Sequence, residues 1–395
     1  MKKILYSLFA MALFLVSCAK QDTVYKEFVV SGGYIYPAKP INVEAVSGYQ
    51  RIFVNWERPM DPSLRSSKVF WNNRRDSLSF NYSDYPDGNL SAVISDLEDR
   101  SYTFEVINYD ADGHSSLAVE VTAAPFGDSW LVSHAERSVL SAKYIDGKTY
   151  IKMSAPTDEI VYTKFRYVNT KGEKVESKNL TASENVLVID DAVRGKFFEY
   201  QSAYCPAAGI DTVWTSNWLP SPKAITYNID ITKATASVTD NQIRDSFVPG
   251  LILDGIKDDS NSRYFSTNVS TYRDVFPKII VVDTKEIGDN SMTFDSFVFY
   301  QDPAPDAQTR RYLRSVYVYV GDTKFNANDM NYSRNFGEPV LKATLNQNEA
   351  EQEFSVSESK SGRYIAIVFR TSYNSSGFVD LWEFEAFGYA ANKAE

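Results

Sequence analysis

The sequence predicts an all-β protein built from more than one sandwich domain. The chain has 395 residues, and this length favours two or three domains over one small core. Tyrosine (26) and phenylalanine (24) are abundant, and valine, isoleucine and threonine recur in short runs. No long stretch of the mature chain shows a convincing helical period, so strands should dominate.

The N-terminal segment predicts where the protein resides. Two lysines precede an apolar run over residues 4–16, which is too short to span a bilayer. Ser17 and Cys18 follow, and a small residue before a cysteine resembles the lipobox of bacterial lipoproteins. We therefore expect residues 1–17 to be a signal peptide and Cys18 to be the lipid-anchored first residue of the mature chain. The alternative is an ordinary secretion signal in which Cys18 is incidental.

Residues 18–37 hold a mostly polar stretch that we expect to tether the folded part to the membrane. Ala19 follows the lipidated cysteine, whereas an acidic residue at this position retains lipoproteins in the inner membrane of enteric bacteria. We therefore expect an outer-membrane lipoprotein at the cell surface, with the periplasmic face as the open alternative.

Charge and cysteine content exclude several classes of partner and site. The formal net charge is −10, and loss of the two signal-peptide lysines makes it −12. This acidity argues against nucleic acid and anionic membrane surfaces as partners. With Cys18 lipidated, Cys205 has no disulfide partner, and we expect it to be a small buried residue. His114 and His134 cannot by themselves form a zinc site.

Residues 38–124 alternate apolar and polar side chains as strands do. The inward positions of two such strands are Ile52, Val54 and Trp56, and Tyr102, Phe104 and Val106. With the turn at Gly113, these residues resemble a fibronectin type III domain, in which a tryptophan fills the core and a tyrosine makes a corner hydrogen bond. Leu97 lies one residue closer to Tyr102 than is usual in that family, which leaves the corner bond open.

Residues 61–77, with Arg51 and Trp56, are similar to an uncharacterised family of Bacteroidota lipoproteins with fibronectin-like modules. That resemblance implies a lineage but no activity. Trp71 fits either a strand aromatic that covers the core or a surface aromatic that meets a ligand.

A second, weaker fibronectin III-like copy is expected over residues 125–226. Its strand over residues 148–153 is followed by a proline, as in the first copy, but the core tryptophan is missing. Trp214 and Trp218 could pack against the next domain or present a binding face.

The C-terminal part, residues 227–392, has a different order of sequence motifs from the two preceding domains. An apolar-Asp-Gly turn over residues 251–255 precedes Phe265-Ser266 and a proline-led strand over residues 277–283. The tail, residues 382–388, reads as a closing strand. This order resembles the coagulation-factor type C, or discoidin-like, domain, which implies an eight-stranded jelly-roll sandwich.

Many relatives in that family bind sugars through loop aromatics, flanked by side chains that hydrogen-bond to the hydroxyls. We therefore expect the binding residues on loops of the C-terminal domain. The candidates are Tyr264, Tyr272, Arg273, Arg310, Arg311, Tyr312, Tyr373 and Asn374.

A structural calcium ion is also common in the family, and it is held by hard oxygen ligands. Asp254, Asp258 and Glu383 match the family's ligand positions. The alternative for Asp258 and its neighbour Asp259 is a solvated acidic loop.

The resemblances together imply a non-catalytic carbohydrate-binding lipoprotein that captures glycans for a polysaccharide-utilisation system, with a TonB-dependent transporter as partner. The sequence has no phosphate loop, nucleophile elbow or zinc-protease helix, so we expect no enzyme. The alternative is a structural or adhesive lipoprotein whose C-terminal domain binds a protein.

Overall fold

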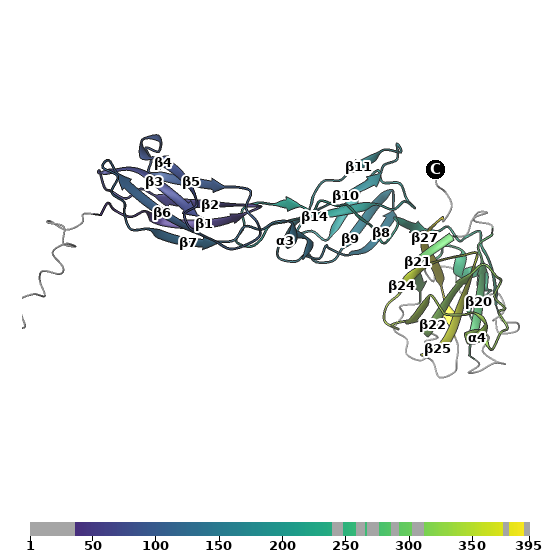
Figure 1. The fold of residues 1–395 in the computed structure, drawn as a ribbon. Coiled ribbons are helices and arrows are strands. Elements are labelled where there is room, and N and C mark those ends of the chain that lie inside the picture. The colour runs from purple at the N-terminus through teal and green to yellow at the C-terminus, as the bar shows by residue number, and fades with distance from the viewer. Residues whose placement is uncertain are drawn as a thin grey trace, which may run out of the picture. The chain divides into compact units, whose positions relative to one another are not determined.

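The chain is all-β, as the sequence predicts (Figure 1). The computed structural model describes residues 36–238, 248–257, 265–266, 276–285, 292–301, 312–373 and 379–390. The predicted signal peptide, Cys18 and most of the tether lie outside these ranges. Within them, no helix is long and apolar enough to cross a membrane.

The chain divides into two compact units. One contains the residues up to Ala135 together with Cys205–Val213, and the other contains Glu136–Tyr204 and the chain from Trp214 onward. The first unit is therefore completed by a short segment that returns from the middle of the sequence. The predicted domain boundaries at residues 124 and 226 stay predictions.

The first unit is a sandwich of two antiparallel sheets. One sheet has the order β1 (Ile41–Gly48), β2 (Arg51–Glu57), β5 (Asn89–Ile94). The other has the order β4 (Asp76–Asn81), β3 (Leu64–Trp71), β6 (Tyr102–Asp110), β7 (Val119–Ala123). Two short helices accompany them, η1 (Tyr82–Asp84) and α3 (Asp128–Val132).

The predicted core positions of the first unit are confirmed. Trp56 is 2% exposed and meets Phe80 edge to face, with ring centroids 5.1 Å apart. The backbone N–H of Glu98 donates to the hydroxyl of Tyr102 at 3.1 Å, so the corner bond left open by the sequence is made. Trp71 is partly buried and packs against this core, as the first of its two interpretations has it.

Segment 205–213 is fixed to the first unit by an ion pair. Arg51 donates to Asp211 through Nε at 2.9 Å and Nη2 at 2.6 Å, and this guanidinium is the main reason that the pKa of Asp211 is lowered. Cys205 is half-buried, with its sulfur 3.4 Å from the carbonyl oxygen of Gly209.

The second unit begins with a sandwich around its own core. Strands β8 (Val139–Ile145), β9 (Lys148–Met153) and β13 (Val186–Ile189) form one side. The other side contains β10 (Ile160–Val168), β11 (Lys174–Glu176), β12 (Leu180–Thr181), β14 (Glu199–Tyr204), β15 (Val213–Trp214) and β16 (Leu219–Pro220).

A short strand joins this sandwich to the C-terminal one. β17 (Thr226–Asn228) pairs parallel with β8, and on its other edge it pairs antiparallel with β27 (Glu383–Ala390). The resulting seven-stranded sheet has the order β13-β9-β8-β17-β27-β21-β24. Its last two strands are β21 (Met292–Tyr300) and β24 (Glu351–Gly362).

The facing sheet of the C-terminal sandwich has five strands in the order β18-β20-β25-β22-β23. They are β18 (Thr235–Val238), β20 (Lys278–Asp283), β25 (Tyr364–Ser372), β22 (Leu313–Gly321) and β23 (Leu341–Thr344), and the remaining elements are η2 (Pro249–Leu253), β19 (Phe265–Ser266), α4 (Tyr332–Asn335) and β26 (Asp380–Leu381). Aromatic side chains fill the space between the sheets; Phe297 and Phe384 stack with centroids 5.5 Å apart.

The outer face of the seven-stranded sheet is set by alternation along β21 and β27. Phe297 and Phe384 point into the core, so their neighbours Val298 and Glu385 point outward and pair across the strands. Tyr300 and Phe387 continue this outer face. The strands thus present a mixed aromatic and charged surface where the two sandwiches meet.

Candidate functional site

Two adjoining hollows of the second unit share Arg194 and Tyr227 among their lining residues, and together we call them the junction groove. The first has a volume of about 440 Å³ and lies over the outer face of the shared sheet, with Tyr144 and Tyr300 among its lining residues. The second has a volume of about 610 Å³ and is lined by the loops around Lys171 and Arg194. The groove is therefore built from strands and loops of both sandwiches.

A hydrogen-bonded network fixes the floor of the first hollow. Glu385 accepts from Nζ of Lys257 at 2.7 Å, from Nδ2 of Asn228 at 3.0 Å and from the hydroxyl of Tyr300 at 2.8 Å. Lys257 also donates to the Tyr300 hydroxyl at 2.9 Å. Burial, and then the bond to Glu385, raises the pKa of Tyr300, so its phenol stays protonated. The floor is a rigid polar surface.

Lys143 closes one side of this hollow. Its Nζ lies 4.4 Å from the ring centroid of Phe387 and pairs with the carboxylate of Glu353. Four carboxylates line this hollow, those of Asp146, Glu351, Glu353 and Glu385, and lysines neutralise two of them, Glu353 and Glu385.

The rim shared by the two hollows consists of aromatic rings and one arginine. Cζ of Arg194 lies 4.7 Å from the ring centroid of Tyr227 and 5.9 Å from that of Tyr144. Both rings are partly exposed, and Arg194 is exposed. Gly195 has φ +80°, a conformation that other residues rarely adopt, and this lets the loop turn immediately after Arg194.

The predicted calcium ligands Asp254 and Glu383 are neighbours in the fold. Glu383 is 2% exposed, and the backbone N–H of Gly255 donates to its Oε2 at 3.1 Å. Burial raises the pKa of Glu383 to about 9, with the carboxylate of Asp254 as the next cause. A buried carboxylate that has a second carboxylate beside it offers the oxygen ligands that a hard cation such as calcium prefers. The third predicted ligand, Asp258, lies outside the described residues.

Most of the predicted sugar-binding residues also lie outside the described residues, namely Tyr264, Tyr272, Arg273, Arg310, Arg311 and Asn374. Tyr312 is only 4% exposed, whereas Tyr373 is 37% exposed. The two are brought together, because the N–H of Tyr373 donates to the carbonyl oxygen of Tyr312 at 3.0 Å. The hydroxyl of Tyr373 donates to the carbonyl oxygen of Leu345 at 2.7 Å. The loop site as a whole stays a prediction.

The junction groove itself was not predicted from the sequence. Its residues come from β8, β17, β27 and the loop of Arg194, which are far apart in the chain. No local motif marks them. The one signal that the sequence offered was a tyrosine, Tyr227, directly after the predicted domain boundary at residue 226.

Trp214 and Trp218 lie in a stack that we call the cation–aromatic ladder. Its members are Tyr162, Trp214, Lys164, Trp218 and Arg166. Nζ of Lys164 lies 4.8 Å from the ring centroid of Trp214 and 5.3 Å from that of Trp218. Cζ of Arg166 lies 3.9 Å from the ring centroid of Trp218. The two tryptophans therefore lie against cations of their own sandwich.

The ladder is completed by an acidic residue. Glu176 accepts from Lys164 at 2.8 Å and from Arg166 at 2.9 Å. Lys164 and then Arg166 hold the pKa of Glu176 below its ordinary value.

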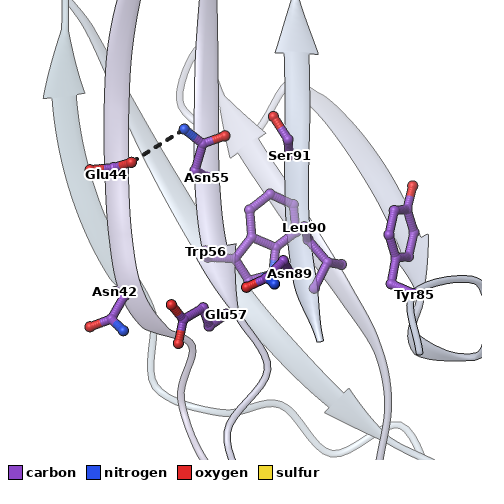
Figure 2. Close-up of a pocket in the computed structure, with 9 residues that line it drawn as sticks. All are labelled: Asn42, Glu44, Asn55, Trp56, Glu57, Tyr85, Asn89, Leu90 and Ser91. Atoms are coloured by element: carbon purple, nitrogen blue, oxygen red, sulfur yellow. Dashed lines mark hydrogen bonds between the residues drawn. The ribbon is translucent and has the colours of Figure 1, made fainter. Parts of the chain in front are cut away.

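The first unit has a hollow of its own, of about 600 Å³, on the face of β1, β2 and β5 (Figure 2). Nδ2 of Asn55 lies 3.4 Å from Oε1 of Glu44, the bond drawn in Figure 2. The hollow is otherwise lined largely by amides, carboxylates and a serine, and its tryptophan, Trp56, is buried in the core. Tyr85 is its one partly exposed ring, whereas the junction groove has two, Tyr144 and Tyr227, so it is a weaker candidate for sugar binding than the junction groove.

The turn around Asp110, Asp112 and His114 brings three possible metal ligands together. The carboxylate of Asp110 is already used, because it accepts from the backbone N–H of Asp112 and of His114 and pairs with the His114 ring at 2.8 Å. The carboxylate of Asp110 accordingly raises the pKa of His114. The cluster is explained by the turn.

Comparisons with known proteins found a family model and several solved structures that resemble parts of this chain. A family model described as a domain of unknown function matches residues 18–213. No curated protein matches the sequence. A family 32 carbohydrate-binding module of C. perfringens NanJ, solved with galactose, is 13% identical, covers 41% of this chain and 99% of its own, and has a TM-score of 0.31.

Two further solved structures are similar. A SusE-like protein, BT2857, is 9% identical over 88% of this chain and 96% of its own, with a TM-score of 0.35. The C-terminal domain of a Bacteroides fragilis chitobiase is 13% identical over 42% of this chain and 99% of its own, with a TM-score of 0.31. What this chain binds has to be inferred from its own residues.

Proposed function

We propose that this chain is a non-catalytic glycan-binding protein and that the junction groove is a binding site for sugar. The observation that carries the proposal is the rim of that groove, where the partly exposed rings of Tyr144 and Tyr227 stand beside a fixed polar floor. Sugars offer an apolar ring face and a periphery of hydroxyls. A site with flat aromatic surfaces and a few convergent polar groups matches both.

Two of the four carboxylates that line the groove, Glu353 and Glu385, support a binding role over a hydrolytic one. Glycoside hydrolysis needs one carboxylic acid and one carboxylate across the scissile bond. Glu385 accepts three hydrogen bonds, and Glu353 is paired with Lys143. Groups engaged in this way serve to hold the floor rigid.

The proposal includes a cellular setting, which the N-terminal sequence supports. The basic start, the short apolar run and Ser17-Cys18 support lipid anchoring at Cys18. Ala19 supports transfer to the outer membrane, and we place the protein at the cell surface. There it captures glycans for a polysaccharide-utilisation system and a TonB-dependent transporter.

A structural calcium ion is part of the proposal. Asp254 and Glu383, together with Asp258, would hold it, and the ion would neutralise the buried carboxylate of Glu383. We propose Tyr373 and Asn374, as predicted from the resemblance, for a second place where sugar would bind.

The experiment that tests the function is affinity electrophoresis of the chain from residue 19 onward, because β17 ties the two sandwiches of the second unit together. Plant, host-mucin and microbial polysaccharides are compared, with and without a chelator. The expected result is retardation by one class of polysaccharide, lost in Tyr227→Ala and kept in Trp218→Ala. No retardation by any polysaccharide would overturn the proposal in favour of a protein-binding adhesin.

A further inference from the structure

We propose that the junction groove selects glycans that carry an acidic group, and that Arg194 binds this group. The inference rests on the proposed function, since it names the class of glycan that the same groove takes. The ligand chemistry is a carboxylate or sulfate attached to a sugar ring.

The charge of the second hollow is the first argument. Three basic residues line it, Lys171, Arg194 and Lys196, and no acidic residue does among those that the structure describes. The whole chain has a net charge of −10, so this local excess of positive charge runs against the average. Such a hollow attracts anions, although the rest of the protein repels them.

The geometry of Arg194 is the second argument. Its guanidinium lies over the ring of Tyr227, with Cζ 4.7 Å from the centroid. Stacking on a ring orients the guanidinium while its N–H donors remain available to a planar anion. Arg194 makes no ion pair with any residue that the structure describes. It is exposed and lines both hollows, so an anion bound there is in reach of each.

The third argument is a matched arginine elsewhere in the same unit. Arg166 stacks on Trp218 in the same way, at 3.9 Å, but its donors are taken by Glu176 at 2.9 Å and approached by Glu199 at 3.8 Å. The stacked Arg166 thus has a carboxylate partner within the protein, namely Glu176. At Arg194 that carboxylate is missing among the described residues, and an acidic sugar would provide it.

The neutral part of the sugar can bind in the first hollow, beside the acidic group held by Arg194. Tyr144 and Asn228 line the first hollow next to Arg194, and they offer a ring face and an amide. Adjacent units of a polysaccharide can therefore occupy the two hollows together.

The test compares polysaccharides that differ only in charge. Polygalacturonate is paired with its highly methyl-esterified form, and dextran sulfate with dextran, so that carboxylate and sulfate are tested separately. The expected result is tighter binding of at least one charged member of these pairs, weakened by salt because the contact is electrostatic.

Two arginine variants make the test specific. Arg194→Gln should weaken binding of the charged polymer about 10-fold, the size expected for loss of a charge-assisted hydrogen bond. Arg334→Gln removes another exposed arginine of the same unit, outside the groove, and should change nothing.

The outcomes separate the inference from the function. Binding of neutral polysaccharides alone, with Arg194→Gln unchanged, would overturn the inference while the proposed function stands. Equal loss in both arginine variants would also overturn it, because attraction to surface charge in general would then explain the binding. Absence of binding to every polysaccharide would remove the proposed function as well.

Discussion

The cation–aromatic ladder and the junction groove each contain an arginine that lies on an aromatic ring, but the arginine has a structural role in the ladder and a proposed binding role in the groove. In the ladder, Arg166 lies on Trp218 and its donors are engaged by Glu176. In the groove, Arg194 lies on Tyr227 without an ion pair to any described residue. The difference lies in the acidic side chains, since Glu176 and Glu199 face Arg166 and no described carboxylate pairs with Arg194. It teaches that an aromatic ring with a cation on it is ambiguous until the partner of the cation is known.

The buried Glu383 is the reverse case, since this acidic group makes no ion pair with the described residues. Its neighbours include the like-charged Asp254, and Lys257 is engaged by Glu385. The largest effect we expect is therefore a pH dependence of stability without divalent cations. The pKa of Glu383 is about 9 in the folded protein, above the ordinary value of 4.5. The stability that the proton contributes is complete below pH 4.5 and is lost as the pH rises through about 9.

The measurement is thermal unfolding of the second unit from pH 5 to pH 9 in the presence of a chelator. We expect the stability to fall by a few kcal/mol, about 3, across this range. Glu383→Gln should flatten the curve, and added calcium should restore stability at high pH. Identical curves for the variant and the parent protein would show that Glu383 does not titrate in this way.

Removal of the ring beneath Arg194 should have the next largest effect. Tyr227→Ala deletes an aromatic face of the groove and the support of the guanidinium, so we expect a loss of glycan affinity of about 30-fold, or about 2 kcal/mol. Tyr227→Phe keeps the face and should retain most of the affinity. Isothermal titration calorimetry with the best polysaccharide ligand checks both, and unchanged affinity in the alanine variant would place the sugar elsewhere.

Disruption of the ladder should affect stability alone. Trp218→Ala removes a half-buried ring that lies against two cations, so the free energy of unfolding should fall by about 1–2 kcal/mol. Trp218→Phe should recover part of this loss. Chemical denaturation measures the change, and electrophoresis on the polysaccharide should show unaltered retardation; loss of retardation would make the ladder a binding surface.

The smallest effect is expected from Glu176→Gln. This change removes the carboxylate that pairs with Lys164 and Arg166, so these cations become available to a ligand, as Arg194 is in the groove. Surface ion pairs contribute little, so the cost in stability should stay below about 1 kcal/mol. The sharper readout is binding: retardation by acidic polysaccharide should rise slightly. A decrease would contradict the view that an open, stacked cation attracts an acidic ligand.

The strand pattern of the sequence predicted the all-β fold because alternation is a local property. Trp56 and the strand around Tyr102 are where the spacing of apolar residues placed them. The corner bond was in doubt because one residue of spacing in a loop does not decide where a hydroxyl points. The bond is made to the backbone of Glu98, which the sequence alone could not fix.

The junction groove could not be predicted for a different reason. Thr226 of β17 lies opposite Lys143, and Tyr227 lies opposite Gly388, so the groove depends on pairings between distant segments. Composition and periodicity carry no information on such pairings. The interpretation of Trp214 and Trp218 as domain packing or a binding face missed the ladder, because Lys164 and Arg166 are some fifty residues away on another strand.

The three residues of β17 also limit how this protein can be divided. This strand pairs with β8 on one edge and with β27 on the other, so it belongs to both sandwiches. Cutting the chain beside it would leave an unpaired edge on one of them, and bare edges invite association between molecules. Recombination or truncation at this point would therefore give fragments that tend to aggregate, so the two sandwiches are expected to be inherited and expressed together.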